Sequence, residues 1–288
     1  MPNAGPCLRG PDVNTGLPTT LVSIATPTTP LDGAWYLPQG GKIAGAVLLF
    51  HGNTMNFYTG MLRFLPPLLV EMGYACLAFN RRGHDILAIR DSRAAEGAAY
   101  QTIAQAVEDN ALAARWVAEQ GYANPLVIGH SNGGMLAVRH VADHPGTPAL
   151  GLLSAHCGGR EIAPRMARAG LLAADRFDEL NALARSYVRE GRGNELLQVP
   201  GWWYVLSAAS YVDWLDNVPD ILELAPRIRC PVLYVRGDQE PAETYPAEEF
   251  ARQAGAACTV EIVADCNHFY VGREVQVRQV VGRWLTAL

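Results

Sequence analysis

Residues 125–144 read PLVIGHSNGGMLAVRHVADH, and this stretch carries the clearest indication of the fold. Positions 125–129 form an apolar run without polar alternation, which is typical of a strand buried on both faces. Positions 133–144 resume the apolar spacing of a helix. The two segments meet at Ser131 in the pentapeptide GHSNG, which matches G-x-S-x-G. Between a strand and a helix this pattern predicts a nucleophile elbow, a tight turn that raises the serine hydroxyl above a sheet.

Strands and helices alternate on both sides of this stretch. The patterns predict further strands at 21–25, 34–37, 45–51, 74–80, 149–155, 231–236 and 259–263. Apolar residues at helical spacing predict helices at 61–72, 101–120 and 273–288, and Pro66 and Pro67 are expected to kink or divide the first of these. This alternation indicates an α/β fold with a mostly parallel, twisted sheet and helices on both faces.

The alternation is interrupted between residues 160 and 229. This segment shows helical patterns only, the clearest of them at 171–192. We expect it to form a helical cap over the carboxyl edge of the sheet, where open α/β folds bind ligands. The expected organisation is an irregular N-terminal segment at 1–20, an α/β core at 21–159 and 230–288, and the cap at 160–229.

Composition and charge exclude several classes of protein. Of 288 residues, 49% are hydrophobic and 18% charged, which provides a large core and is unlike a disordered chain. A net charge of −5 argues against a nucleic-acid binder. No run approaches the roughly 20 apolar residues of a membrane helix, and residues 1–20 lack the apolar core of a signal peptide. We therefore expect a cytoplasmic protein with neither nucleic-acid nor membrane partners.

The cysteines are spread along the chain without C-x-x-C pairing. They are Cys7, Cys76, Cys157, Cys230, Cys258 and Cys266. Their spacing favours reduced, buried thiols over a disulfide framework or a metal site. We expect neither a metal ion nor a cofactor.

A serine hydroxyl needs a base within hydrogen-bond reach, and an acid behind that base, to act as a nucleophile at neutral pH. His268 lies in a loop after the last predicted strand, at the same edge of the sheet as Ser131. This position favours it as the base over the other histidines, which are His51, His84, His130, His140, His144 and His156. The acid is expected in the loop after the strand at 231–236, where Asp238 and Glu240 are both candidates. The order serine, acid, histidine is the one expected of this fold.

Two backbone N–H groups are candidates for binding a negatively charged oxygen. The strand at 45–51 is followed by Gly52, which lets the backbone approach a substrate closely, so the N–H of Asn53 can point into the site. The N–H of Asn132, directly after Ser131, is the second donor. Together they predict an oxyanion hole.

These segments resemble the α/β-hydrolase family in its serine-hydrolase branch. The resemblance covers residues 21–288 except the cap, and it is carried by His51-Gly52-Asn53, Arg82-Gly83-His84, positions 129–134, positions 231–241 and Asn267-His268-Phe269. In the family the acid commonly lies three residues after the glycine that ends its strand. The resemblance therefore implies Glu240 rather than Asp238, although a glutamate departs from the more usual aspartate. Ser131 departs from the aspartate nucleophile of haloalkane dehalogenases and epoxide hydrolases.

The cap segment is rich in aromatic residues. Trp202, Trp203 and Tyr204 follow a Pro-Gly turn, and Tyr211 and Trp214 come a few positions later. Two roles are open for these side chains. They either line the substrate pocket as a hydrophobic lid or form the small core of the cap itself.

The expected function is a cofactor-independent serine hydrolase that cleaves a carboxylic ester or lactone of a small molecule. Ser131 would form the acyl-enzyme, with His268 as base, Glu240 as acid, and Asn53 and Asn132 as oxyanion donors. A thioesterase, an amidase or a carbon–carbon bond hydrolase would use the same residues. Outside the enzymes, the alternative is a ligand-binding receptor on the same scaffold, since a fold does not fix a function. The presence of nucleophile, base, acid and oxyanion donors argues against that receptor.

Overall fold

The computed structural model describes residues 16–40, 43–90, 93–94 and 96–288, so Cys7 and most of the segment at 1–20 lie outside the described residues. The strands of its main sheet are β1 (Thr19–Ile24), β2 (Leu31–Tyr36), β3 (Gly45–Phe50), β4 (Tyr74–Phe79), β5 (Leu126–His130), β6 (Leu150–Leu153), β9 (Val232–Gly237) and β10 (Cys258–Val263). The helices packed around this sheet are α1 (Met61–Glu71), α2 (Ile103–Glu119), α3 (Asn132–Asp143), α7 (Ile221–Leu224), the 3-10 helix η2 (Ala225–Arg227), α8 (Ala247–Gln253) and α9 (Glu274–Thr286).

The sheet has the order β1-β2-β4-β3-β5-β6-β9-β10. β2 is antiparallel to both β1 and β4, and every other pair of neighbours is parallel. All residues of β5, β6 and β9 are buried, as expected for strands covered on both faces. The predicted α/β fold with a mostly parallel sheet is confirmed.

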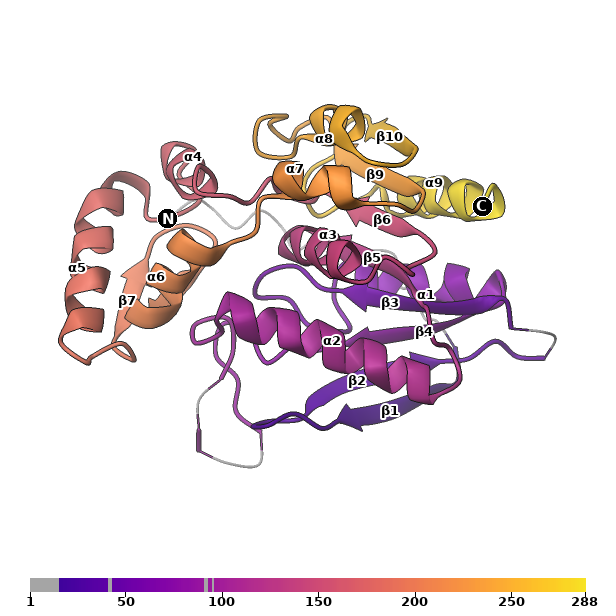
Figure 1. The fold of residues 1–288 in the computed structure, drawn as a ribbon, viewed down its shortest axis with the longest axis horizontal. Helices are drawn as coiled ribbons and strands as arrows, with labels where there is room; N and C mark the ends of the chain where they lie inside the picture. Colours follow the sequence, from indigo (N-terminus) through magenta and orange to yellow (C-terminus); the bar gives the residue numbers. More distant parts are fainter. Residues whose placement is uncertain (1–15, 41–42, 91–92, 95) are drawn as a thin grey trace.

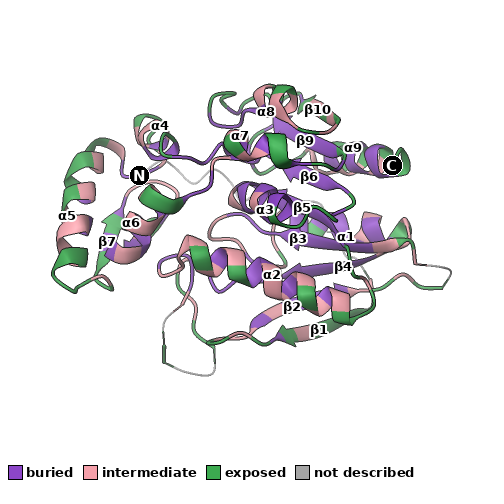
Figure 2. Cartoon of the chain, viewed as in Figure 1, coloured by how far each residue is buried: buried purple, intermediate pink, exposed green. Residues whose placement is uncertain are grey.

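Helices cover both faces of the sheet (Figure 1). α1 and α9 contact each other on one face, and α2, α3 and α8 lie on the other. Successive residues of β3 enter different cores: Val47 and Leu49 pack with α1 and α9, whereas Leu48 and Phe50 pack with α2 and α3. Figure 2 shows the buried strands as the central layer between the half-exposed helices. This layering places the carboxyl ends of the parallel strands side by side at one edge.

The inserted segment stands beside the sheet, at the left of Figure 1. Its elements are α4 (Ile162–Arg168), the 3-10 helix η1 (Ala174–Arg176), α5 (Phe177–Arg189), β7 (Leu196–Val199), β8 (Tyr204–Ser207) and α6 (Ala208–Asn217). The prediction of helices only is wrong here, because β7 and β8 pair as an antiparallel hairpin. β7 alternates exposed and buried residues with the period of a strand, and Pro200 and Gly201 supply the turn.

Two further elements differ from the sequence prediction. The pattern at 259–263 predicts a strand buried on both faces, but β10 is the edge strand, pairs with β9 and exposes Thr259 and Ile262. Pro66 and Pro67 do not divide α1, which continues from Met61 to Glu71. Because proline has no backbone N–H, two hydrogen bonds of the helix are missing at these positions. Packing of the buried side of α1 against the sheet stabilises the helix in their place.

The described cysteines are free thiols. Cys76, Cys157, Cys230 and Cys266 are buried, as predicted, while Cys258 is half-buried. Within the described residues, no cluster of three or more histidine, cysteine or acidic side chains is placed to hold a metal ion. None of the helices in the described part of the chain has the length and apolar character needed to cross a membrane.

Several histidines are buried without a carboxylate partner. His140, on α3, packs edge-to-face on Phe50 and stacks on His144 with ring centroids 4.1 Å apart. Burial, together with the neighbouring His144, lowers the pKa of His140 from 6.5 to about 3. His140 is therefore neutral in the folded protein across the mildly acidic range in which the unfolded chain takes up a proton.

We predict that this burial makes the protein less stable in mild acid. Between the unfolded pKa of 6.5 and the folded pKa of about 3, the unfolded state binds the extra proton, so the free energy of unfolding falls as pH drops. His140→Gln should reduce the slope of that fall by up to about 1.4 kcal/mol per pH unit, measured by urea unfolding at a series of pH values. The wild type is the reference for this slope, and an equal slope in His140→Gln would contradict the prediction.

Candidate active site

Ser131 lies in the tight turn between β5 and α3, with φ 54° and ψ −121°. Few residues with a side chain adopt this conformation, and here the Ser131 N–H holds it by donating to the Leu153 carbonyl oxygen at 2.9 Å. The flanking glycines are required by space. A Cβ at Gly129 would lie 2.3 Å from the carbonyl oxygen of Gly133, and one at Gly133 would lie 2.2 Å from that of Phe50. The turn presents the hydroxyl at the carboxyl edge of the sheet.

Three side chains from distant parts of the sequence form one hydrogen-bond chain. The Ser131 hydroxyl donates to His268 Nε2 at 3.0 Å, and His268 Nδ1–H donates to Glu240 Oε1 at 2.7 Å. The three residues are only 6%, 9% and 5% exposed, respectively. In this arrangement the imidazole can take the serine proton while the carboxylate fixes its tautomer and orientation.

The two candidate acids have different contacts. Glu240 is the one that reaches the imidazole. The carboxylate of Asp238 instead accepts the backbone N–H groups of Asp265 and Cys266, at 2.9 and 3.0 Å, and these bonds lower its pKa. Asp238 therefore shapes the turn that precedes His268.

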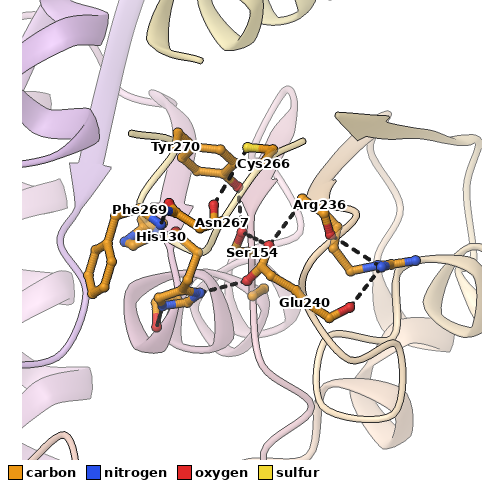
Figure 3. Close-up of polar contacts among 12 residues, drawn as sticks. His130, Ser154, Arg236, Glu240, Cys266, Asn267, Phe269 and Tyr270 are labelled. Carbon is orange, nitrogen blue, oxygen red and sulfur yellow. Dashed lines mark hydrogen bonds and ion pairs between the residues drawn. The ribbon is translucent and has the colours of Figure 1, made fainter. Parts of the chain in front are cut away.

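Oε2 of Glu240, the carboxylate oxygen that does not contact His268, has partners that the sequence analysis did not identify. Oε2 accepts the Gly237 N–H at 2.8 Å and the Ser154 hydroxyl at 2.6 Å, and the Tyr270 hydroxyl lies 2.6 Å from the Ser154 oxygen (Figure 3). Since the Ser154 proton goes to the carboxylate, the Tyr270 hydroxyl proton is shared between the Ser154 oxygen and the Val235 carbonyl oxygen, which lies 3.3 Å away. The only sequence signal for Ser154 is its place at the end of a strand next to the one that carries Ser131.

His130, the second residue of the pentapeptide, holds the backbone of the histidine loop. Its Nε2–H donates to the carbonyl oxygen of His268 at 2.9 Å, and the two rings lie 4.8 Å apart. Burial lowers the pKa of His130 to about 3, with a smaller contribution from the charge of His268. A neutral His130 therefore supports the loop without placing a positive charge beside His268.

His51 orients the backbone N–H of Asn53 through a hydrogen bond to the peptide group that joins Gly52 and Asn53. His51 Nε2 accepts the Arg81 N–H at 3.1 Å, so the proton of His51 is on Nδ1, which donates to the Gly52 carbonyl oxygen at 2.7 Å. In a trans peptide the N–H points opposite to the carbonyl, so the Asn53 N–H faces away from His51. Neither this group nor the Asn132 N–H, at the start of α3, donates to an acceptor within the described residues.

A pocket of about 340 Å³ opens at Ser131 and His268. The other residues that line it are Gly52, Asn53, Thr54, Met55, His130, Trp202, Tyr204 and Phe269. This lining contains no lysine, arginine, aspartate or glutamate. The pocket therefore suits an uncharged substrate with some apolar surface.

The cap aromatics divide between the two roles left open by the sequence. Trp202 and Tyr204 line the pocket. Trp203 is only 4% exposed and packs on Trp214 with ring centroids 5.1 Å apart, so it belongs to the core of the cap. All three residues lie at the turn between β7 and β8, where Trp203 faces the cap core and Trp202 and Tyr204 face the pocket.

Comparison with known proteins identifies the family. The sequence profile of the Alpha/beta hydrolase family matches residues 47–280. The chain therefore belongs to this family, and membership supports a hydrolase. No curated protein matches the chain.

Solved structures share the fold at low sequence identity. Est1E from Butyrivibrio proteoclasticus, with ferulic acid bound, is 20% identical with a TM-score of 0.70, covering 92% of this chain and 98% of its own. An esterase from Pyrococcus furiosus is 19% identical with a TM-score of 0.64, covering 95% and 92%. A dienelactone hydrolase from Anabaena variabilis is 16% identical with a TM-score of 0.59, covering 94% and 98%. At these identities the likeness shows the fold.

We predict that a fluorophosphonate probe labels Ser131 and that the two acidic residues affect this labelling differently. Glu240→Gln removes the charge that orients His268, and should slow labelling by up to about 10⁴-fold. Asp238→Asn should label at nearly the wild-type rate but unfold at a lower temperature, because the turn at 265–266 loses its charged acceptor. The labelled residue is identified by peptide mass spectrometry, with Ser131→Ala as the blank. Fast labelling of Glu240→Gln together with slow labelling of Asp238→Asn would reverse the assignment of the acid.

Proposed function

We propose that the protein is a serine hydrolase that cleaves a carboxylic ester or lactone of a small molecule through an acyl-enzyme on Ser131. The observation that carries this proposal is the hydrogen-bond chain from Glu240 through His268 to Ser131 beside an uncharged pocket. Membership of the Alpha/beta hydrolase family supports it. The fold shared with an esterase and a dienelactone hydrolase is consistent with ester and lactone substrates.

In the first half of the reaction the Ser131 oxygen attacks the substrate carbonyl while His268 Nε2 takes the serine proton. The carbonyl oxygen becomes negatively charged, and the N–H groups of Asn53 and Asn132 stabilise it; each such donor contributes roughly 3 to 4 kcal/mol to lowering the barrier. Glu240 stabilises the imidazolium that forms. His268 then gives the proton to the leaving oxygen, which departs as the alcohol or stays attached as the opened lactone.

In the second half a water molecule takes the place of the leaving alcohol. His268 removes a proton from this water, whose oxygen attacks the acyl carbon, and the same two N–H groups hold the second oxyanion. Collapse of the intermediate returns the proton to the Ser131 oxygen and releases the carboxylic acid. Gly52 contributes by leaving space, because a Cβ there would lie 2.9 Å from Met55 Sδ and 3.0 Å from His130 Nδ1.

We predict that the wild-type protein turns over p-nitrophenyl acetate and butyrate continuously. The assay measures the nitrophenol that is released. Ser131→Ala removes the nucleophile and should reduce kcat by on the order of 10⁶-fold. A panel of acyl esters of increasing chain length, with lactones and acyl thioesters in parallel, identifies the preferred substrate.

Other results of this assay would contradict the proposal. One equivalent of nitrophenol without further turnover would favour a ligand-binding receptor on the hydrolase scaffold. Turnover of thioesters with none of esters or lactones would favour a thioesterase. Equal rates for the wild type and Ser131→Ala would mean that Ser131 is not the nucleophile.

A further inference from the structure

Four aromatic rings surround the imidazole of His268. The ring centroids of His130, Trp202, Tyr245 and Phe269 lie 4.8, 5.0, 5.1 and 5.1 Å from it. Trp202 is the one that stacks nearly parallel, with an angle of 22° between the ring planes, whereas the other three are inclined by 39° to 77°. Trp202 is also the one of the four that comes from the inserted segment.

The position of Trp202 is fixed by its surroundings in the cap. Its backbone N–H donates to the Leu171 carbonyl oxygen at 2.9 Å. Gly201 has φ +106°, and a Cβ there would lie 2.3 Å from the same oxygen, so the chain can make this approach only at a glycine. The next residue, Trp203, is buried against Trp214. The indole of Trp202 is therefore held over His268 by the hairpin turn and the core of the cap.

We propose that Trp202 is a positioning residue for the reaction, and that its indole face holds the His268 ring between Glu240 and Ser131 and stabilises the imidazolium. This inference rests on the function proposed above. The two ring nitrogens are tied to their partners by hydrogen bonds, and the stacked indole adds packing against one face of the imidazole. The cap hairpin thus adds a ring contact to the hydrogen-bond chain of Ser131, His268 and Glu240, whose members all come from the core.

The chemical contribution of Trp202 is electrostatic. When the proton leaves the Ser131 oxygen for His268 Nε2, the imidazole becomes a cation, and the negative face of the stacked indole attracts that charge. The charge is lost again when the proton passes to the leaving oxygen, and Trp202 neither gains nor loses a proton. The stacked indole also covers one face of the ring and excludes water from it.

Trp202 also lines the pocket, so its effect on the base must be separated from substrate binding. Tyr204 provides the matched control. It lies two residues away, lines the same pocket and is 61% exposed, and among the described residues it makes no ring contact with His268. A substitution at Tyr204 changes the pocket wall and leaves the stack on the imidazole intact.

The experiment compares Trp202→Leu, Trp202→Phe and Tyr204→Leu in ester hydrolysis and in fluorophosphonate labelling of Ser131. Trp202→Leu should lower kcat and the labelling rate by about 3- to 30-fold with little change in KM, and Trp202→Phe should recover most of the loss. The acidic limb of the kcat/KM profile should move to lower pH in Trp202→Leu, because the imidazolium loses a favourable contact. The titratable groups that interact with the ring, Glu240, His130, His156 and Tyr245, are present in all variants. Tyr204→Leu should change KM alone.

A second readout does not depend on turnover. A protonated imidazole quenches a stacked indole, so the wild-type protein should lose tryptophan fluorescence as pH falls, and this component should be absent from both Trp202→Phe and His268→Gln. A kinetic profile of Trp202→Leu that matches Tyr204→Leu, with KM changed and kcat, labelling and pH limb unchanged, would overturn the proposal. So would a fluorescence titration that persists in Trp202→Phe. If the wild type hydrolyses no ester, the proposed function fails, while labelling and fluorescence still test the stack.

Discussion

Gly133 lies against the carbonyl oxygens of Phe50 and His51, and a Cβ there would be 2.2 and 2.3 Å from them. This close approach lets α3 begin directly beside the end of β3. It places the start of α3, with the Asn132 N–H, next to the loop that carries the Asn53 N–H. The same turn holds Ser131 in its unusual backbone conformation. The proposed nucleophile and the two proposed oxyanion donors therefore depend on one contact between two backbone segments, and the rest of the site is assembled around it.

His268 and Glu240, the proposed base and acid, join this arrangement from the other end of the chain. Parallel pairing of β5, β6 and β9 brings the loops after these strands to one edge, so Ser131, Ser154 and Glu240 come within reach of each other. Glu240 is longer than an aspartate by one methylene, and its Oε2 atom is held by Ser154 and the Gly237 N–H. These two hydrogen bonds restrict the extra rotatable bond of the glutamate side chain.

The cap contributes differently from the core. Core elements supply the groups proposed to exchange protons and to bind the oxyanion, each on a strand end or a short turn. The cap supplies apolar surface, with Trp202 on the imidazole and Tyr204 at the pocket wall, while Trp203 keeps the hairpin attached to the cap core.

The sequence by itself determined the sheet strands, the elbow at Ser131 and the loop of His268, because buried parallel strands and a glycine-flanked serine leave strong local patterns. It also limited the acid to two residues. The resemblance to α/β-hydrolases favoured Glu240 of the two, and the tertiary structure places Glu240 against the imidazole, which depends on the direction of side chains two residues apart. Only the tertiary structure showed the contacts of Ser154 and Tyr270, the stacking of Trp202 on His268 and the hairpin in the cap. These features arise from contacts between segments far apart in the chain, and such contacts leave no periodicity along it.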